Sequence, residues 1–301
     1  MAISQVRVQI NGSWHTLTKG SNGKYSATIT APGRTSYHEY GNYFNVKVEA
    51  TNTAGTIGTA DASDLSGLRL FVKERIAPVI TIKSPSVGAY VTNNRQPVVF
   101  EIKDESGGSG VNINSLVVKQ DGTAVNPATI THTHPEGNTF KVTYTPDSAL
   151  SDGQHYVSID VKDFDGNSAT KKEIYYNIDT VPPTLNVSEP AEGLVTASQT
   201  ITVSGSTNDQ TSSPVTVRIK LNGSDQGNVE VKSSGQFDKS VMLVEGNNTI
   251  IVTATDTAGK QSSLTRNVVL DTSVPVVTSA TIQPNPVDVG NTMIITVEVT
   301  G

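Results

Sequence analysis

The feature that most constrains the fold is a strand that occurs three times and ends each time in the same kind of turn. Its copies read "FNVKVEATNTAG" from Phe44, "YVSIDVKDFDG" from Tyr156 and "IIVTATDTAG" from Ile250. Apolar and polar residues alternate in each copy, and the central apolar residue precedes the turn glycine by seven positions in all three (48 to 55, 159 to 166 and 252 to 259). This period and spacing predict an all-β chain built from repeated antiparallel sandwiches.

Length and charge narrow the classes of function. A chain of 301 residues with 35% hydrophobic content is long enough for two or three domains with modest cores. Its 22 Lys and Arg residues are scattered and the net charge is −6, which argues against a nucleic-acid partner. We find no apolar run near the roughly 20 residues that span a bilayer, so no membrane partner is expected. The opening "MAISQVRVQING" enters strand-like alternation at once, and no cleaved signal is expected.

Proline-containing junctions also repeat along the chain. "IDTVPPTLNV" from Ile178 and "LDTSVPVV" from Leu270 each close one domain and open the next, and "KERIAPVITI" from Lys73 is a looser copy. Proline restricts the backbone of such short linkers, so we expect the domains to form an elongated, semi-rigid rod. The predicted domains are 1–76, 77–179 and 180–272, followed by a partial segment, 273–301, with two strands.

The junctions and turns resemble those of a known family. Residues 77–272 resemble tandem bacterial immunoglobulin-like domains, which carry "D-x-x-P-P" linkers and "A-T-D-x-A-G" turns. The wider chain, including "VQINGSWHTLT" and "PNPVDVGNTMIITVEVT", resembles immunoglobulin-like tail and virion proteins of phages and prophages of Gram-positive bacteria. This resemblance implies tandem immunoglobulin-like β-sandwiches and a structural role in a virion.

Alignment of the repeats exposes an asymmetry at the two ends of the sequence. "QVRVQING" near the start corresponds to the third strand of domain 180–272, "VTVRIKLNG", so the first domain is predicted to lack its first two strands. The segment 273–301 contains those two strands. We therefore hypothesise that it donates strands to the first domain of another copy or of a neighbouring protein. The exchange face would comprise Met293, Ile295, Val297 and Val299 on the donor, and Val6, Val8 and Ile10 on the acceptor.

Two other arrangements remain open. The first domain can be a small sandwich complete in itself, with the final segment folded against domain 180–272. Alternatively, the sequence can be a piece of a longer array of the same domains.

Two minor sites are weighed against structural explanations. Asp163, Asp165 and Asn167 in "DFDGN" are weak candidate calcium ligands, and "KDESGGSG" adds Asp104 and Glu105 in the same domain. Asx-Gly turns use the same residues without metal. Tyr37, Tyr40 and Tyr43 in "SYHEYGNYF" form a candidate recognition surface for a protein or a glycan. The structural alternative places these rings at the rim of the sandwich.

Catalytic motifs are absent from the sequence. It shows no Ser-His-acid set in a motif context and no Gly-rich phosphate loop, so we expect neither enzymatic activity nor a cofactor. The favoured interpretation is a phage-tail component, made in the host cytoplasm, whose partners are other virion proteins or copies of itself. The alternative is a bacterial surface adhesin or stalk segment that binds a protein or a surface glycan.

Overall fold

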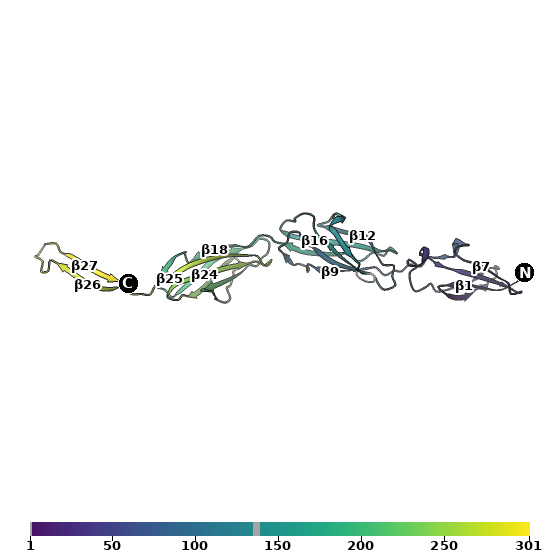
Figure 1. The fold of residues 1–301 in the computed structure, drawn as a ribbon, viewed down its shortest axis with the longest axis horizontal. Helices are drawn as coiled ribbons and strands as arrows, with labels where there is room; N and C mark the ends of the chain where they lie inside the picture. Colours follow the sequence, from purple (N-terminus) through teal and green to yellow (C-terminus); the bar gives the residue numbers. More distant parts are fainter. Residues whose placement is uncertain (1, 135–138) are drawn as a thin grey trace. The chain divides into compact units, whose positions relative to one another are not determined.

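The computed structural model describes residues 2–134 and 139–301, which divide into two compact units, Met1–Ile178 and Asp179–Gly301. Their regular structure is almost entirely β, as the alternating sequence pattern predicts. The fold class is confirmed: the chain consists of tandem immunoglobulin-like β-sandwiches (Figure 1). We refer to residues 2–76, 77–178 and 179–272 as the first, second and third domains.

The second domain is a two-sheet sandwich with strand orders β10-β17-β16-β12-β13 and β14-β15-β11-β9. Its core lies between the sheets, where Phe100 and Ile102 of one sheet and Ile159 of the other are fully buried. The elements are β9 (Val79–Ser84), β10 (Tyr90–Val91), β11 (Val98–Lys103), β12 (Val111–Gln120), β13 (Thr123–Ala124), η3 (Pro127–Thr129), β14 (Ile130–Thr133), β15 (Thr139–Tyr144), β16 (Gly153–Asp163) and β17 (Lys172–Ile178).

The third domain repeats this architecture with strand orders β18-β20-β23 and β19-β25-β24-β21-β22. Val203 and Phe237 of the first sheet pack in one core with Ile219 and Val252 of the second. The elements are β18 (Thr184–Glu189), β19 (Leu194–Thr196), β20 (Thr200–Asn208), β21 (Thr216–Leu221), β22 (Ser224–Asp225), β23 (Gln236–Met242), β24 (Gly246–Thr255) and β25 (Gln261–Leu270).

The first domain has one four-stranded sheet, β2-β1-β6-β7, and two short strand pairs, β3-β4 and β5-β8. Neither of the two core clusters includes any of its residues. The elements are β1 (Ile3–Ile10), β2 (Ser13–Thr16), β3 (Thr18–Lys19), β4 (Tyr25–Ser26), η1 (Tyr40–Asn42), β5 (Phe44–Asn45), β6 (Lys47–Asn52), β7 (Ile57–Ala60), η2 (Ser66–Leu68) and β8 (Arg69–Leu70).

One strand register is common to the three domains. In each domain the central residue of the repeated strand pairs with the same position of a neighbouring strand. The pairs are Val48↔Val8 in the first domain, Ile159↔Val118 in the second and Val252↔Ile219 in the third. Each domain then turns through a two-residue hairpin in which both residues have positive φ. Asn and Asp tolerate this conformation and Gly favours it, which is why these hairpins read Asn-Gly or Asp-Gly. The hairpins are Asn11-Gly12, Asp121-Gly122 and Asn222-Gly223.

The chain ends in the terminal strand pair, which comprises β26 (Val276–Gln283) and β27 (Ile294–Thr300) (yellow in Figure 1). The two strands pair antiparallel and form a two-stranded sheet of their own. Every residue of both strands is exposed. Two strands without a covered face are marginal in water.

Candidate interaction surfaces

The first domain contains counterparts of most strands of the third domain. Its β3-β4 hairpin corresponds to the hairpin that leads into β23: the N–H of Gly23 bonds to Gly20 as that of Gly235 bonds to Lys232. By this match Tyr25 occupies the position of Phe237. In the third domain Phe237 pairs with Gly205 of β20, whereas β4 pairs only with β3. No strand among residues 2–76 occupies the position of β18 or β20.

One face of the first domain's sheet is covered unevenly: Val6 and Val8 of β1 are buried, with 8% and 7% of their surface exposed. Val48 and Ala50 of β6 point to this face and are partly exposed. The equivalent residues of the third domain, Val252 and Ala254, are fully buried. Because the two domains share the same register here, the difference comes from what covers the sheet and not from the strands themselves.

The terminal strand pair is amphipathic. One face is apolar in every cross-strand pair: Val277↔Val299, Ala280↔Val297 and Ile282↔Ile295. The opposite face is mostly polar, with pairs such as Thr281↔Thr296 and Ser279↔Glu298. Among the paired valines and isoleucines of the apolar face, exposure runs from 43% at Ile282 to 61% at Val277. Met293, which precedes β27, is also exposed.

This pair matches the first two strands of a complete domain. β9, β18 and β26 are each followed directly by proline, at Pro85, Pro190 and Pro284. The residue before the proline pairs with the second strand as Glu189↔Ser204 in the third domain and Gln283↔Ile294 here. By this register Ile295 occupies the position of Gly205, opposite Phe237.

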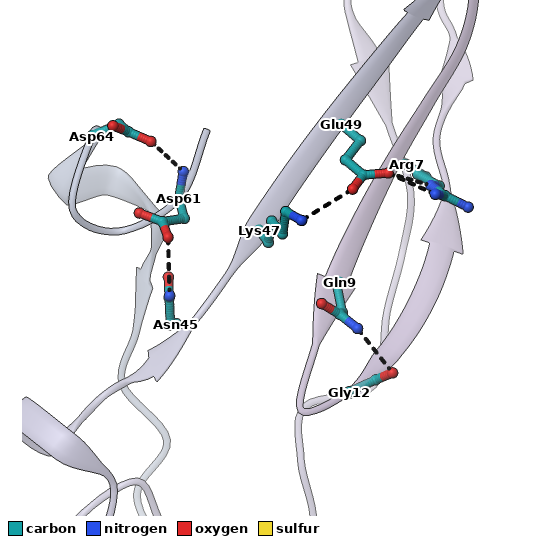
Figure 2. Close-up of polar contacts among 8 residues, drawn as sticks. All are labelled: Arg7, Gln9, Gly12, Asn45, Lys47, Glu49, Asp61 and Asp64. Atoms are coloured by element: carbon teal, nitrogen blue, oxygen red, sulfur yellow. Dashed lines mark hydrogen bonds and ion pairs between the residues drawn. The ribbon is translucent and has the colours of Figure 1, made fainter. Parts of the chain in front are cut away.

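The other face of the first domain's sheet is polar and already satisfied. Arg7 donates to Glu49 at 2.8 Å and Lys47 lies 3.2 Å from the same carboxylate, as Figure 2 shows. The hydrogen bond from Arg7 is the main reason that the pKa of Glu49 is lowered. The Arg7 guanidinium also lies over the ring of Trp14, 4.3 Å from its centroid. On this face Arg7 and Lys47 are partly exposed, and together they neutralise the buried Glu49 carboxylate.

The three tyrosines of the candidate recognition surface do not form one surface, because each ring has a different environment. Tyr37 stacks on Phe164 of the second domain with ring centroids 4.5 Å apart, and Tyr43 contacts Phe71. Tyr40 is 97% exposed. Of the three rings, only that of Tyr40 is left largely open to solvent.

The candidate calcium ligands of the second domain are hydrogen-bonded within the protein. Asp163 accepts from the backbone N–H of Asn167 at one carboxylate oxygen and from its side-chain amide at the other. Asp165 accepts from the Thr35 hydroxyl at 2.6 Å and from the backbone N–H of Glu74 at 3.1 Å. These residues therefore hold the turn and tie the first domain to the second.

A cluster of three acidic side chains lies beside this contact. Glu74, Asp104 and Glu105 bring carboxylate oxygens within 4.8 Å of one another. Burial, followed by the hydrogen bond with Glu74, raises the pKa of Glu105 to about 8. Burial also raises the pKa of Asp104. Burial alone would raise the pKa of Glu74, but hydrogen bonds from Glu105 and Ser109 outweigh it and lower that pKa.

The Glu105 shift predicts a pH-dependent stability of residues 1–178. A folded pKa of about 8 against an ordinary 4.5 means that the folded state binds more protons between these values, so stability falls as pH rises through that window. We expect Glu105→Gln, which is neutral at every pH, to remove most of this fall. Differential scanning calorimetry of the Met1–Ile178 transition at pH 5 and pH 8 measures it.

Glu101→Gln is the matched control for this prediction. Glu101 lies in the same domain and pairs with Lys83 at 2.8 Å, a hydrogen bond that lowers its pKa out of the window. This variant should keep the wild-type slope between pH 5 and pH 8. An equal slope in Glu105→Gln and wild type would contradict the assignment to Glu105.

The sequence pointed to Asp104 and Glu105 of the first acidic cluster but not to Glu74, and it did not point to the second cluster. This second cluster joins Asp179, Asp209 and Asp256 in the other unit. A positional signal links the two clusters: Asp104 and Asp209 each directly follow the second strand of their domain. Apolar alternation aligns the strands but says nothing about the residue beyond a strand end, so it does not predict Asp209.

Comparisons with known proteins agree with the sandwich fold. Residues 87–180 match the family model described as bacterial Ig-like domain, and residues 183–272 match the one described as glucodextranase, domain B. No curated protein matches the chain. In the part of the chain that the structure describes, no helix has both the length and the apolar character needed to cross a bilayer.

Similar solved structures contain several sandwich domains in series. The fibronectin(III)-like modules of Clostridium thermocellum CbhA are 14% identical, with a TM-score of 0.40, over 64% of this chain and 94% of theirs. A titin I-band fragment is 11% identical, with a TM-score of 0.44, over 88% of this chain and 87% of its own. Sidekick-1 immunoglobulin domains 1–5 are 13% identical, with a TM-score of 0.38, over 99% of this chain and 60% of theirs. The two family matches follow one another along the sequence, and each covers a sandwich with the shared strand register. The chain is a tandem immunoglobulin-like protein.

Proposed function

We propose that this chain is a non-enzymatic assembly protein in which the terminal strand pair of one copy completes the first domain of another. The observation that carries the proposal is the match between two surfaces. The apolar face of β26-β27 has the register of the first two strands of a domain, and the first domain lacks strands at that place. The strand pair has an exposed apolar face, and the first domain has an open strand edge beside partly exposed apolar residues.

The proposed contact has a defined geometry. The donated β27 pairs with the edge of β4, as β20 pairs with β23, and its apolar side chains cover the partly exposed Val48 and Ala50. Ile295 of the donor then faces Tyr25 of the acceptor, as Gly205 faces Phe237 in the third domain. Burial of each valine or isoleucine contributes about 1.5–3 kcal/mol, and new ladder hydrogen bonds remove an open strand edge.

Such a contact joins two different surfaces, so it leaves a free donor and a free acceptor on every pair of copies. Head-to-tail interfaces of this kind build rings or filaments instead of closed dimers. A chain of structural modules that polymerises in this way suits a phage tail or a related virion. Tail genes beside the gene for this chain would support that setting, and their absence would count against it.

A cross-link between the two surfaces tests the contact directly. The chain contains no cysteine, so introduced thiols have no competing partner. Paired residues of antiparallel strands have Cα atoms about 4.5–5.5 Å apart, within the range of a disulfide. We expect the double variant Tyr25→Cys/Ile295→Cys to form a covalent ladder of oligomers under mild oxidation, visible by non-reducing electrophoresis.

The control moves one thiol to the opposite face of the same strand. Tyr25→Cys/Thr296→Cys should give no ladder, because Thr296 faces away from the acceptor. Each single variant can form a dimer at most. A double variant Tyr25→Cys/Ile295→Cys that stays monomeric, or that links its two thiols within one chain, would contradict exchange between copies.

A further inference from the structure

The third domain holds a cluster of three carboxylates independent of the proposed strand exchange. Asp179, Asp209 and Asp256 bring one carboxylate oxygen each within 4.8 Å of the others. Asp179 is 0% exposed and Asp256 is 5% exposed. No ion pair of the described residues links a lysine or arginine to any of the three. Three close carboxylates repel one another strongly where water is excluded.

One oxygen of this cluster has no hydrogen-bond donor. Asp256 accepts from the backbone N–H of Lys260 through Oδ1 at 2.8 Å, whereas its Oδ2 is buried without a partner among the described residues. A buried polar atom left unsatisfied costs free energy, so an unpaired carboxylate oxygen points to a missing ligand. The other two carboxylates accept hydrogen bonds. Asp179 accepts from the backbone N–H of Val181 and from the Ser212 hydroxyl, and Asp209 accepts from the backbone N–H groups of Thr211 and Ser212.

The second domain shows what satisfies the same oxygen. Asp163 ends β16 at the place where Asp256 follows β24, and the donor four residues later is Asn167 in one domain and Lys260 in the other. The Asn167 amide donates to Asp163 Oδ2 at 2.7 Å. Lys260 contributes only its backbone N–H, which bonds to Oδ1 of Asp256. The equivalent oxygen in the third domain, Asp256 Oδ2, therefore has no hydrogen-bond donor among the described residues.

We propose that Asp179, Asp209 and Asp256 bind a calcium ion. Calcium takes six to eight oxygen ligands at about 2.3–2.6 Å, so two ligands on opposite sides lie at most about 5 Å apart, which matches the spacing of this cluster. The Ser212 hydroxyl and water complete the oxygen shell. The absence of nitrogen and sulfur ligands argues against zinc.

The ion has a structural consequence for the third domain. Asp179 lies five residues before β18 (179 to 184), and Asp209 and Asp256 directly follow β20 and β24. One cation therefore ties the segment that leads into the first strand to the ends of two core strands. Calcium binds the folded domain and not the unfolded chain, so it raises the domain's melting temperature.

Isothermal titration of the full chain, freed of metal with a chelator, tests the proposal with calcium chloride as the probe. We expect calcium binding at this site, weaker binding of magnesium, and a calcium-dependent rise of several degrees in the calorimetric transition of the Asp179–Gly301 unit. All nine tyrosines and Trp14 precede Asp179, so calorimetry is a better probe of this unit than aromatic fluorescence. No heat of binding and no calcium-dependent shift would overturn the proposal.

Three variants assign the site. Asp256→Asn should weaken binding at least tenfold. Lys260→Asn should do the same while leaving the metal-free domain folded, because it supplies the amide that Asn167 supplies in the second domain. Asp225→Asn, at an exposed residue 3.1 Å from Arg218, is the control and should bind as wild type. Wild-type affinity in both Asp256→Asn and Lys260→Asn would place any bound calcium elsewhere and overturn the assignment.

Discussion

Replacing Val297 by aspartate is expected to abolish the proposed self-association and leave a monomer. Val297 lies in the middle of the apolar face of β27, opposite Ala280, and is 49% exposed within a single copy. In the proposed assembly it becomes buried over the first domain, where an unpaired carboxylate costs several kcal/mol. We expect association to weaken by at least about 100-fold, which corresponds to roughly 2.7 kcal/mol. Size-exclusion chromatography with light scattering over a concentration series measures it.

Thr296→Asp is the matched control, since Thr296 is the neighbouring residue on the polar face of the same strand. It introduces the same charge into the same hairpin but leaves the apolar face intact. This variant should keep the wild-type oligomer distribution. Both substitutions sit on exposed residues, so neither should unfold the second or third domain. A wild-type chain that stays monomeric at the highest concentration would reject the proposed assembly.

Phe237→Ala is expected to cause the largest loss of stability in the Asp179–Gly301 unit. Phe237 is 2% exposed, and its ring lies directly over Gly205, where an added Cβ would come within 2.7 Å of the ring. Truncation of a buried phenylalanine leaves a cavity and costs about 3–5 kcal/mol. Calorimetry should show the transition of this unit shifted down by about 10 °C or more, with the Met1–Ile178 transition unchanged.

Tyr25→Ala likewise removes an aromatic ring, at the equivalent position of the first domain. Tyr25 is only partly buried, because no second strand covers it in a single copy. We therefore expect it to destabilise the monomer by less than Phe237→Ala does, and to weaken self-association. An equal loss of stability in monomers of both variants would mean that the first domain is already complete.

The repeated strand was the part of the sequence that predicted most of the fold. Its alternation and turn glycines located the same strand in three domains, and the structure pairs Val48, Ile159 and Val252 in one register. The third copy of this strand was recognised from Ile250, whereas the strand itself begins at Gly246. Periodicity locates a strand because side chains alternate between core and solvent, but hydrogen bonding to neighbours decides where it ends.

The sites were less accessible from the sequence than the strands. Clustering of Tyr37, Tyr40 and Tyr43 along the chain suggested one surface, but neighbouring residues in a loop can point to different partners. Tyr37 and Tyr43 pack against Phe164 and Phe71, which are distant in the sequence. Similarly, the acidic turn of the second domain was found by its local pattern, whereas the two clusters of close carboxylates combine residues from two and three separate segments.

The sequence by itself determined the sandwich class, the shared register and the amphipathic character of β27, because each follows from which residues alternate along one strand. Only the tertiary structure decided which faces are covered. Val48 and Val252 have the same local pattern, yet one is partly exposed and the other fully buried. The third domain has a second sheet of three strands, β18-β20-β23, whereas the first domain has only the short pairs β3-β4 and β5-β8 beside its sheet. The sequence likewise did not predict that one carboxylate oxygen of Asp256 is buried without a hydrogen-bond donor among the described residues. Burial and hydrogen-bond partners depend on segments that meet only in the folded chain.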